Sequence, residues 1–274
     1  MAVSKNQIKY IRQLEQKKFR RREGLFVAEG TKVVGDLLAH YQPRAIFATP
    51  EWLAENQGNL SLDSGLTDHG PVPMIQELTP AELSRISFQQ HPQQVLALFP
   101  IPSLNAQHSS LNTQHSSLIT QHSSLSLALD SIQDPGNLGT IIRIADWFGI
   151  TDIFCSEDTV DAWNPKVVQA TMGSIARVHI YYCNLSELLD SLPDDFPVYG
   201  TLLDGDNIFT HQLSPNGIIV MGNEGNGISP EIRAKVNRRL LIPSFRQDDT
   251  AESLNVAIAT AITCAEFRRR PYQP

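Results

Sequence analysis

The sequence contains no apolar run long enough to cross a bilayer and only three cysteines in 274 residues. The first twenty residues are basic and amphipathic without an apolar stretch, so we expect neither a secretory signal nor a membrane anchor. Cys155, Cys183 and Cys264 are odd in number and lack the spacing of a metal site. We therefore expect reduced, buried thiols, no bound metal and a cytoplasmic protein.

Two nucleotide-binding signatures are also missing. Neither G-x-G-x-x-G nor G-x-x-x-x-G-K-[ST] occurs, which disfavours dinucleotide binding and P-loop phosphate binding. The glycines that do cluster, Gly222, Gly225 and Gly227, are suited to letting backbone amides and carbonyls contact an adenine or a ribose directly. The pattern favours a cofactor that is not bound through a phosphate group.

Charge is sparse and unevenly distributed. Hydrophobic residues make up 41% of the chain and charged residues 19%, which is enough for a sizeable core and predicts two domains. The net charge of −7 argues against a surface that binds nucleic acid throughout. Residues 1–22 are the exception, because they hold one acid, Glu15, against eight basic residues: Lys5, Lys9, Arg12, Lys17, Lys18, Arg20, Arg21 and Arg22.

The basic segment has the pattern of a helix. Ser4 and Gln7 form a capping-box signature, and Ile8, Ile11 and Leu14 give it an apolar stripe. A charged helix face is ordinarily only solvated, but such an excess in an acidic protein favours binding to the phosphates of nucleic acid. We predict a helix with a basic, phosphate-binding face.

Residues 1–102 are predicted to form a small α/β domain. Strands are expected at 24–29, 45–48, 73–75 and 94–99, and helices at 31–40 and 80–86. The second of these helices has a capping residue, Thr79, directly before it.

Residues 103–124 carry a repeat. Gln-His-Ser-Ser-Leu recurs every seven residues, beginning at Gln107, Gln114 and Gln121. A coiled coil needs a second apolar position in each heptad, and a metal site needs carboxylate or cysteine partners beside the histidines. The repeat has neither, so we interpret it as a low-complexity linker.

Residues 125–274 alternate between apolar strands and amphipathic helices. Strands are expected at 125–129, 152–155, 178–180, 198–202, 218–221 and 240–242, and helices at 137–148, 165–174, 185–191, 229–238 and 253–270. This alternation predicts a parallel sheet with helices on both faces. Ligands of such sheets bind beyond the carboxyl ends of the strands.

Three polar motifs fall at those strand ends. The first passes from the strand 125–129 through a Pro-Gly turn into a helix that Asn137 can cap, with Arg143 one and a half turns further on. The second is a glycine-rich loop with one carboxylate, Glu224, and the third opens the last helix with Ser253, Leu254 and Asn255. Taken alone, the first motif is equally compatible with an ordinary turn in which Arg143 pairs with Asp146.

Together and in this order, N-x-G-x-x-x-R, M-G-x-E-G-x-G and I-P…S-L-N-V resemble the motifs of the SpoU (TrmH-like) family of RNA ribose 2′-O-methyltransferases over about residues 125–270. The resemblance implies a SPOUT-type α/β domain with a parallel sheet and a C-terminal trefoil knot, S-adenosyl-L-methionine (AdoMet) as cofactor, and a homodimer. The start of the chain resembles the small α/β RNA-binding domain that precedes the catalytic domain in many rRNA-modifying members. We therefore expect domains at 1–102 and 125–274 joined by the linker 103–124.

The resemblance also implies roles for single residues. AdoMet is expected to contact, largely through backbone groups, Thr201, Leu202, Gly222, Glu224, Ile242 and Leu254. Catalysis is expected to depend on Arg143, Asn137, Glu224, Ser253 and Asn255.

Arg143 matches the family's essential arginine. A guanidinium stays protonated in proteins, so we expect Arg143 to hold the ribose and its phosphate and to stabilise the developing alkoxide. Asn137 is expected to fix its loop, and Glu224 either to support the loop or to accept hydrogen bonds from cofactor or RNA. Ser253 and Asn255 lie at a helix N-terminus suited to a phosphate.

The expected reaction is methylation of a ribose 2′-hydroxyl in RNA, with rRNA as the favoured substrate. A tRNA substrate is the first alternative, and the separate N-terminal domain argues against it because tRNA-modifying members commonly use short terminal helices. A non-catalytic RNA-binding protein of the same fold is the second. One departure from the family pattern is the loop 244–252, which is longer than usual, lacks glycine and carries three acids.

Overall fold

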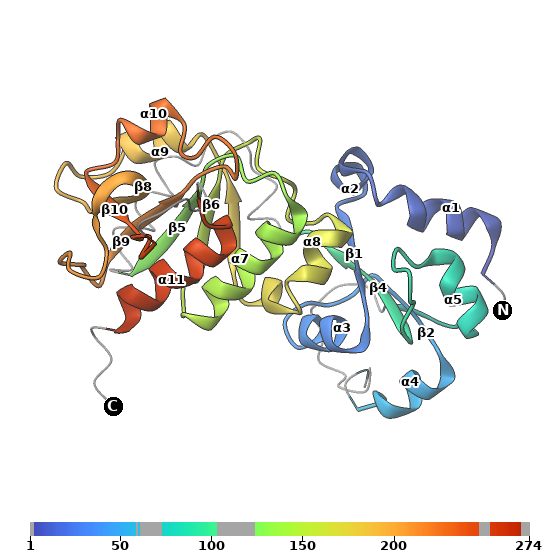
Figure 1. The fold of residues 1–274 in the computed structure, drawn as a ribbon. Coiled ribbons are helices and arrows are strands. Elements are labelled where there is room, and N and C mark those ends of the chain that lie inside the picture. The colour runs from blue at the N-terminus through green and yellow to red at the C-terminus, as the bar shows by residue number, and fades with distance from the viewer. Residues whose placement is uncertain (1–2, 59, 61–72, 103–123, 247–252, 270–274) are drawn as a thin grey trace. The chain divides into compact units, whose positions relative to one another are not determined.

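The computed structural model describes residues 3–58, 60, 73–102, 124–246 and 253–269 (Figure 1). The chain forms two compact units, one of residues 1–102 and 161–176 and the other of residues 103–160 and 177–274. Nearly all of the heptad repeat and most of the long loop 244–252 lie outside the described residues.

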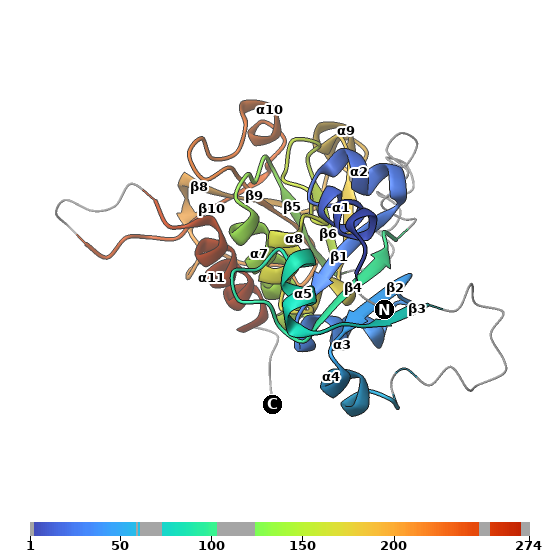
Figure 2. The same ribbon diagram turned by 90° about the vertical axis from the view of Figure 1, so that its right-hand side faces the viewer.

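The first unit is a four-stranded sheet with helices around it (Figure 2). Its strand order is β1-β4-β2-β3, in which β1 and β2 both run antiparallel to β4 and β3 runs parallel to β2. The strands are β1 (Leu25–Glu29), β2 (Ala45–Ala48), β3 (Met74–Glu77) and β4 (Val95–Pro100). The helices are α1 (Lys5–Gln13), α2 (Lys17–Glu23), α3 (Thr31–Leu38), α4 (Pro50–Glu55) and α5 (Pro80–Ile86). The α/β character expected for residues 1–102 is confirmed.

The single basic helix predicted near the N-terminus is wrong in two respects. The capping box of Ser4 and Gln7 is present, but α1 ends at Gln13 and a second helix, α2, begins at Lys17. Arg20 is only 2% exposed and therefore does not belong to a solvent-facing basic surface. The chain turns between the two helices because the buried guanidinium of Arg20 binds the carbonyl oxygens of Leu14 and Glu15.

Helix caps account for α4 and α5 of this unit. Thr79 caps α5 as predicted, in a capping box with Glu82. The sequence reasoning missed α4, although its signal is present: Thr49 accepts a hydrogen bond from the Trp52 amide, and Pro50 occupies the first helical position. Trp52 anchors this helix, because its side chain is fully buried.

The second unit is built on a six-stranded sheet of order β10-β8-β9-β5-β6-β7, in which every pairing is parallel. The strands are β5 (Leu125–Leu129), β6 (Asp152–Cys155), β7 (His179–Tyr182), β8 (Val198–Asn207), β9 (Gly217–Met221) and β10 (Arg238–Leu241). Its helices are α7 (Pro135–Trp147), α9 (Leu185–Asp190), α10 (Pro230–Arg233) and α11 (Val256–Arg269). The predicted α/β fold with a parallel sheet is confirmed. The trefoil knot stays a prediction, since 247–252 lie outside the described residues.

Helices cover both faces of this sheet. Leu188 of α9 and Ile232 of α10 share a buried cluster with Val198 of β8. The next residue of that strand, Tyr199, points to the opposite face, where its ring meets Phe267 of α11 edge-on at 4.8 Å between centroids. Figure 1 shows α11 lying beside α7, and Arg268 of α11 donates to the Phe148 carbonyl at the end of α7.

The expected boundary of the second domain differs from the structure in one segment. Asp161–Ala176, which the sequence reasoning placed with residues 125–274, belongs to the first unit. It holds α8 (Pro165–Ala170) and a short 3-10 helix, η2 (Ser174–Ala176). The predicted helix 165–174 stops at Ala170 because Met172 and Gly173 have positive φ angles of 52° and 96°.

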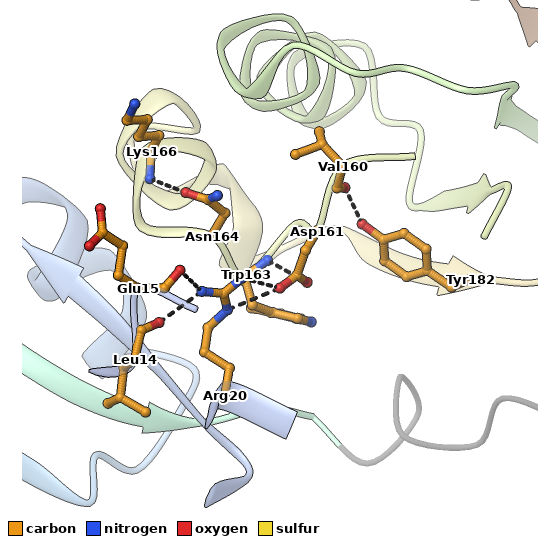
Figure 3. A network of polar contacts seen from close by, with 9 residues as sticks. All are labelled: Leu14, Glu15, Arg20, Val160, Asp161, Trp163, Asn164, Lys166 and Tyr182. Atoms are coloured by element: carbon orange, nitrogen blue, oxygen red, sulfur yellow. Dashed lines mark hydrogen bonds and ion pairs between the residues drawn. The ribbon is translucent and has the colours of Figure 1, made fainter. Parts of the chain in front are cut away.

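Two contacts show why this segment packs in the first unit, and Figure 3 draws the second of them. The Trp163 ring packs against Phe26 of β1 with 4.6 Å between centroids. The Arg20 guanidinium donates to the Asp161 carboxylate, and its Nε lies 2.9 Å from Oδ2. Neither contact can be read from sequence, since about 140 residues separate the partners.

The state of the cysteines and the length of the apolar helices bear on two of the expectations. Cys155, Cys183 and Cys264 are free and buried, as expected. Burial raises the pKa of the Cys183 and Cys264 thiols to about 12, so these thiols are not reactive. Within the part of the chain that the structure describes, no helix has the length and apolar character needed to span a membrane.

Candidate active site

The first loop of the site follows β5 in a strained conformation. Ser131 has a φ angle of 60°, in the left-handed region that a serine seldom occupies. Its amide donates to Ser156 Oγ at 2.8 Å, its hydroxyl donates to Asp158, and its carbonyl accepts from the side chain of Asn223 at 2.7 Å. These contacts hold Ser131 in place, and backbone strain of this kind is common at functional sites.

The helix that follows, α7, begins earlier than predicted. Asp134 is its N-cap, with Oδ1 accepting from the Asn137 amide at 2.8 Å, and Pro135 takes the first helical position. Asn137 is therefore inside the helix rather than its cap. This correction matters because it leaves the Asn137 side chain available for other partners.

The second loop folds back on itself after β9. Asn223 and Gly227 pair through both backbone hydrogen bonds at 2.9 Å. The backbone approaches so closely that a Cβ on Gly222 would lie 2.2 Å from the Gly227 carbonyl carbon and the Ile228 amide nitrogen. A Cβ on Gly225 would meet nothing closer than 3.6 Å. Gly222 is thus required by geometry and Gly225 is not.

One asparagine side chain joins all three motifs. Asn137 Nδ2 donates to Glu224 Oε1 at 2.9 Å, and Asn137 Oδ1 accepts from Asn255 Nδ2 at 2.9 Å. Glu224 also accepts from the backbone amides of Gln133 and Asp134, at 3.5 and 3.4 Å. The Glu224 carboxylate of the second loop is therefore hydrogen-bonded to the first loop. Asn255 of the third motif is hydrogen-bonded to the same Asn137 side chain.

The third motif caps the last helix. Asn255 Oδ1 accepts from the amides of Ala257 and Ile258 at 3.0 and 3.3 Å, so α11 begins at Val256 rather than at the predicted residue 253. Ser253 is exposed, Leu254 is 50% exposed and Ile242 is half-buried. Leu254 is therefore not a core residue, because half of its surface is exposed to solvent.

Arg143 lies on the exposed face of α7. The alternative in which Arg143 pairs with Asp146 is wrong, because Asp146 instead binds Arg177 through both carboxylate oxygens. No ion pair or hydrogen bond of the Arg143 side chain occurs among the residues that the structure describes. Its guanidinium is therefore available for an anionic ligand.

Thr201 and Leu202 occupy an irregular part of β8. The strand continues to Asn207 rather than ending at the predicted residue 202. Its pairing with β9 ends at Gly200, and its pairing with β10 jumps from Gly200 to Asp206. Thr201 and Leu202 therefore leave both ladders. The Thr201 hydroxyl lies 3.7 Å from Met221 Sδ, and Leu202 packs against the buried cluster of this face.

Of the predicted site residues, the structure joins Asn137, Glu224 and Asn255 directly and gives Gly222 a structural reason. The sequence reasoning missed Asn223 and Asp130. Asn223 accepts from the amides of Gly225 and Asn226 while donating to Ser131, and buried Asp130 accepts from the Ser229 amide at 2.7 Å. The available signal was a polar residue one or two positions after a buried strand. Within the described ranges, no three His, Cys, Asp or Glu side chains are arranged to hold a metal ion.

Two protein-family models match this chain. Residues 124–265 match the model of the SpoU rRNA methylase family, which is more than half of the chain. The chain belongs to this family. Residues 5–97 match a second model, the MRM3-like substrate-binding domain.

Solved structures of SpoU and TrmH proteins align with the whole chain. A TrmH-family protein from Porphyromonas gingivalis is 38% identical, with a TM-score of 0.79 over 98% of this chain and 100% of that one. The AdoMet-bound rRNA methyltransferase from Sinorhizobium meliloti is 29% identical, with a TM-score of 0.80 over 100% and 98%.

Curated SpoU relatives match over a shorter region. The 23S rRNA (guanosine(2553)-2′-O)-methyltransferase RlmP of Bacillus subtilis is 37% identical over 52% of this chain and 57% of its own length. The chain spans only about half of the length of the curated relatives it matches first, between 53% and 58%. The three SpoU motifs named from the sequence all lie inside the family match.

Proposed function

We propose that this chain is an AdoMet-dependent methyltransferase that methylates a ribose 2′-hydroxyl in RNA, with ribosomal RNA as substrate. The observation that carries the proposal is the Asn137 side chain, which ties the loops after β5 and β9 to the start of α11 through two hydrogen bonds of 2.9 Å. A chain that kept only the fold would not need three separate polar motifs joined in this way.

The residues of the second loop fit a cofactor that is held by backbone groups. Gly222 has no room for a side chain, because the backbone of residues 227 and 228 lies against it. Leu254 and Ile242 leave apolar surface exposed or half-exposed, and Thr201 and Leu202 leave the strand ladders and free backbone groups there. AdoMet bound there would supply the methyl group. The residues that would hold it are Thr201, Leu202, Gly222, Glu224, Ile242 and Leu254.

Arg143 and the start of α11 hold the RNA. The guanidinium of Arg143 is exposed and unpaired among the described residues, so it can bind the phosphate beside the reacting ribose and stabilise the negative charge that develops on its 2′-oxygen. Ser253 and Asn255 stand at the N-terminus of a fourteen-residue helix, where the amide groups favour a phosphate. Asn137 and Glu224 act through these groups by fixing the loops.

Two observations favour rRNA over tRNA. Residues 5–97 match a substrate-binding domain, and the rRNA methyltransferase from Sinorhizobium meliloti aligns with the entire chain.

The exposed cations of α1 and α2 suit an RNA backbone: Arg22 lies over the Phe19 ring at 4.8 Å, and Lys18 at 4.9 Å. The free, buried cysteines suit the reducing cytoplasm in which ribosomal RNA is made.

The proposal includes a homodimer that uses the α7 and α11 surface. Trp147 is 85% exposed and Ile258 is 52% exposed, which is unusual for large apolar side chains on two helices that contact each other. Light scattering should give twice the chain mass at micromolar concentration, and a monomer would contradict this part of the proposal.

The deciding experiment is methyl transfer from isotope-labelled AdoMet into unmodified rRNA and tRNA fractions, followed by nucleoside analysis. Label in a 2′-O-methyl nucleoside of rRNA is the expected result. Label in tRNA would replace the substrate, and label on a base would overturn the ribose assignment. Absence of both transfer and AdoMet binding, the latter measured by calorimetry, would favour the non-catalytic alternative.

A further inference from the structure

A pocket of about 220 Å³ lies wholly within the first unit, whereas the residues of the candidate active site belong to the second. Val27 and Glu29 of β1 line this pocket, and both are buried, at 1% and 7% exposure. They are two residues apart on one strand, so their side chains point to the same face of the sheet. The walls come from Phe88 and Gln89 and from α8.

The carboxylate of Glu29 has acceptor capacity left over. One oxygen accepts from Ser87 Oγ at 2.5 Å and the other from the Phe88 amide at 2.7 Å. A carboxylate offers about four acceptor positions, so two remain. Burial raises the pKa of Glu29 in spite of these bonds and of the nearby Arg12. The ionised carboxylate of Glu29 can therefore accept more hydrogen bonds than its neighbours donate to it.

The rest of the lining includes the Phe88 ring, two glutamine amides and the ammonium group of Lys166. Gln89 Nε2 donates to Gln169 Oε1 at 2.8 Å, which joins two walls of the pocket. The guanidinium of Arg12 covers the Phe88 ring at 5.4 Å from its centroid. Lys166 lines the pocket and is exposed, so its ammonium group reaches solvent at the rim.

The wall formed by α8 is held firmly. Figure 3 shows the buried Arg20 guanidinium bound to Asp161 and to the carbonyl oxygens of Leu14 and Glu15, while Asn164 caps the start of α8 through the Lys166 amide. A pocket whose walls are fixed in this way is formed before its ligand arrives, as small-molecule sites usually are.

We propose that this pocket binds one unpaired guanine base of the RNA substrate, with the Glu29 carboxylate accepting from the guanine N1–H and N2–H groups. Two parallel N–H donors on one edge are found only in guanine, whereas adenine and cytosine place a ring acceptor beside their amino group and uracil places carbonyls on both sides of its N–H. Phe88 provides an apolar ring for the base, and the cations of Lys166, in the lining, and Arg12, over the Phe88 ring, are suited to its phosphates. A volume below that of drug-sized pockets suits a single base.

The inference rests on the proposed function in that it takes RNA as the substrate. It adds a base-reading site to a unit whose exposed cations suit the RNA backbone, where contacts position RNA without selecting a sequence.

The test is anisotropy of short fluorescent oligouridylates that carry one central guanosine, inosine or adenosine, without AdoMet. Wild type should prefer guanosine over adenosine by roughly tenfold or more, with inosine in between because it lacks the N2 amino group. Glu29→Gln should lose this preference, and Glu55→Gln, which removes an exposed acid of the same unit, should keep it. Equal binding of all three oligonucleotides by wild type, or an unchanged preference in Glu29→Gln, would overturn the proposal.

A second measurement needs no variant, so a folding defect in Glu29→Gln cannot obscure the answer. Photo-crosslinking of wild type to the same oligonucleotide with 6-thioguanosine should label peptides that contain residues 87–89 or 165–169. Labelling exclusively elsewhere would refute the site. Methyl transfer by a protein without guanosine preference would overturn the pocket alone, and guanosine preference without transfer would overturn the methyltransferase assignment alone.

Discussion

The side-chain amide of Asn255 donates to Oδ1 of Asn137 at 2.9 Å, although 118 residues separate them. Because Asn137 also donates to Glu224, its amide has one correct orientation, with the oxygen toward Asn255 and the nitrogen toward Glu224. An amide can satisfy a donor and an acceptor at once, and no other side chain of this size does both with fixed geometry. Asn255 of the third motif is therefore joined to the first two loops through this one amide.

Replacing Asn137 by Asp removes the donor to Glu224 and puts two carboxylates in contact. We expect methyl transfer to fall by about 100-fold through misplacement of the loops. The double variant N137D/E224Q restores a donor between the two positions and should recover part of the loss. Single-turnover transfer rates measure both, and an N137D rate equal to wild type would remove Asn137 from the proposed machinery.

Arg143→Ala should reduce transfer at least 100-fold while leaving AdoMet affinity unchanged, since the guanidinium is proposed to act on the RNA. Arg143→Lys should also be poorly active, because an ammonium cannot bind a phosphate in the same bidentate manner. Arg233→Ala is the matched control, because it removes a half-buried arginine of the same unit whose partner, Asp204, also binds Arg239. Near wild-type turnover by R143A would contradict the assigned role.

Gly222→Ala and Gly225→Ala form a matched pair in one loop. The added methyl at 222 would lie 2.2 Å from backbone atoms that cannot move aside, whereas at 225 it would lie 3.6 Å from Asn223 Oδ1. We expect Gly222→Ala to abolish AdoMet binding and Gly225→Ala to change it little. Titration calorimetry decides, and equal affinities for the two variants would show that the closed loop is not part of the cofactor site.

Arg20→Met leaves the Asp161 carboxylate and two carbonyl oxygens without their donor. Breaking a buried ion pair from one side typically costs about 3–5 kcal/mol, so the first unit should unfold at clearly lower urea. Arg22→Met is the control, since Arg22 is 61% exposed and its ion pair is with Glu23, and exposed pairs contribute about 0–1 kcal/mol. Similar urea midpoints for both variants would mean that the Asp161 pair is not stabilising.

Asp152 and His179 face each other on adjacent strands of the second sheet and should couple its stability to pH. The hydrogen bond to Asp152 raises the pKa of His179 against the opposing effect of burial. Burial raises the pKa of Asp152, but bonds from His179, Thr151 and Tyr181 lower it overall.

The sign of the effect follows from these shifts. The His179 contribution is complete below the unfolded histidine pKa and is lost as pH rises through the raised folded value. The Asp152 contribution is complete above its unfolded pKa and is lost as pH falls through the lowered folded value. Stability from the pair is therefore greatest between the two, and His179→Gln should flatten the alkaline side of the profile. NMR titration showing an ordinary or lowered His179 pKa would exclude this coupling.

The sequence by itself determined the strands of the second unit and their parallel arrangement, because buried apolar runs alternate with helical periodicity from Leu125 onward. It also determined which loops carry chemistry, since polar residues and glycines that directly follow buried strands have few structural reasons to be there. The resemblance of the three motifs, in their order, to the SpoU family identified Asn137, Glu224 and Asn255. Their hydrogen bonds to one another were not predictable, because sequence order contains no distances.

Only the tertiary structure decided the roles of residues whose local pattern was misleading. Arg20 has the pattern of one more surface cation, yet it is buried against Asp161, a residue 141 positions away. Asp161–Ala176 continues the strand and helix alternation of the second unit, yet it packs in the first. In both cases long-range contacts outweighed local propensity, since burying an ion pair and the Trp163 ring depends on surfaces that exist only after both segments have folded.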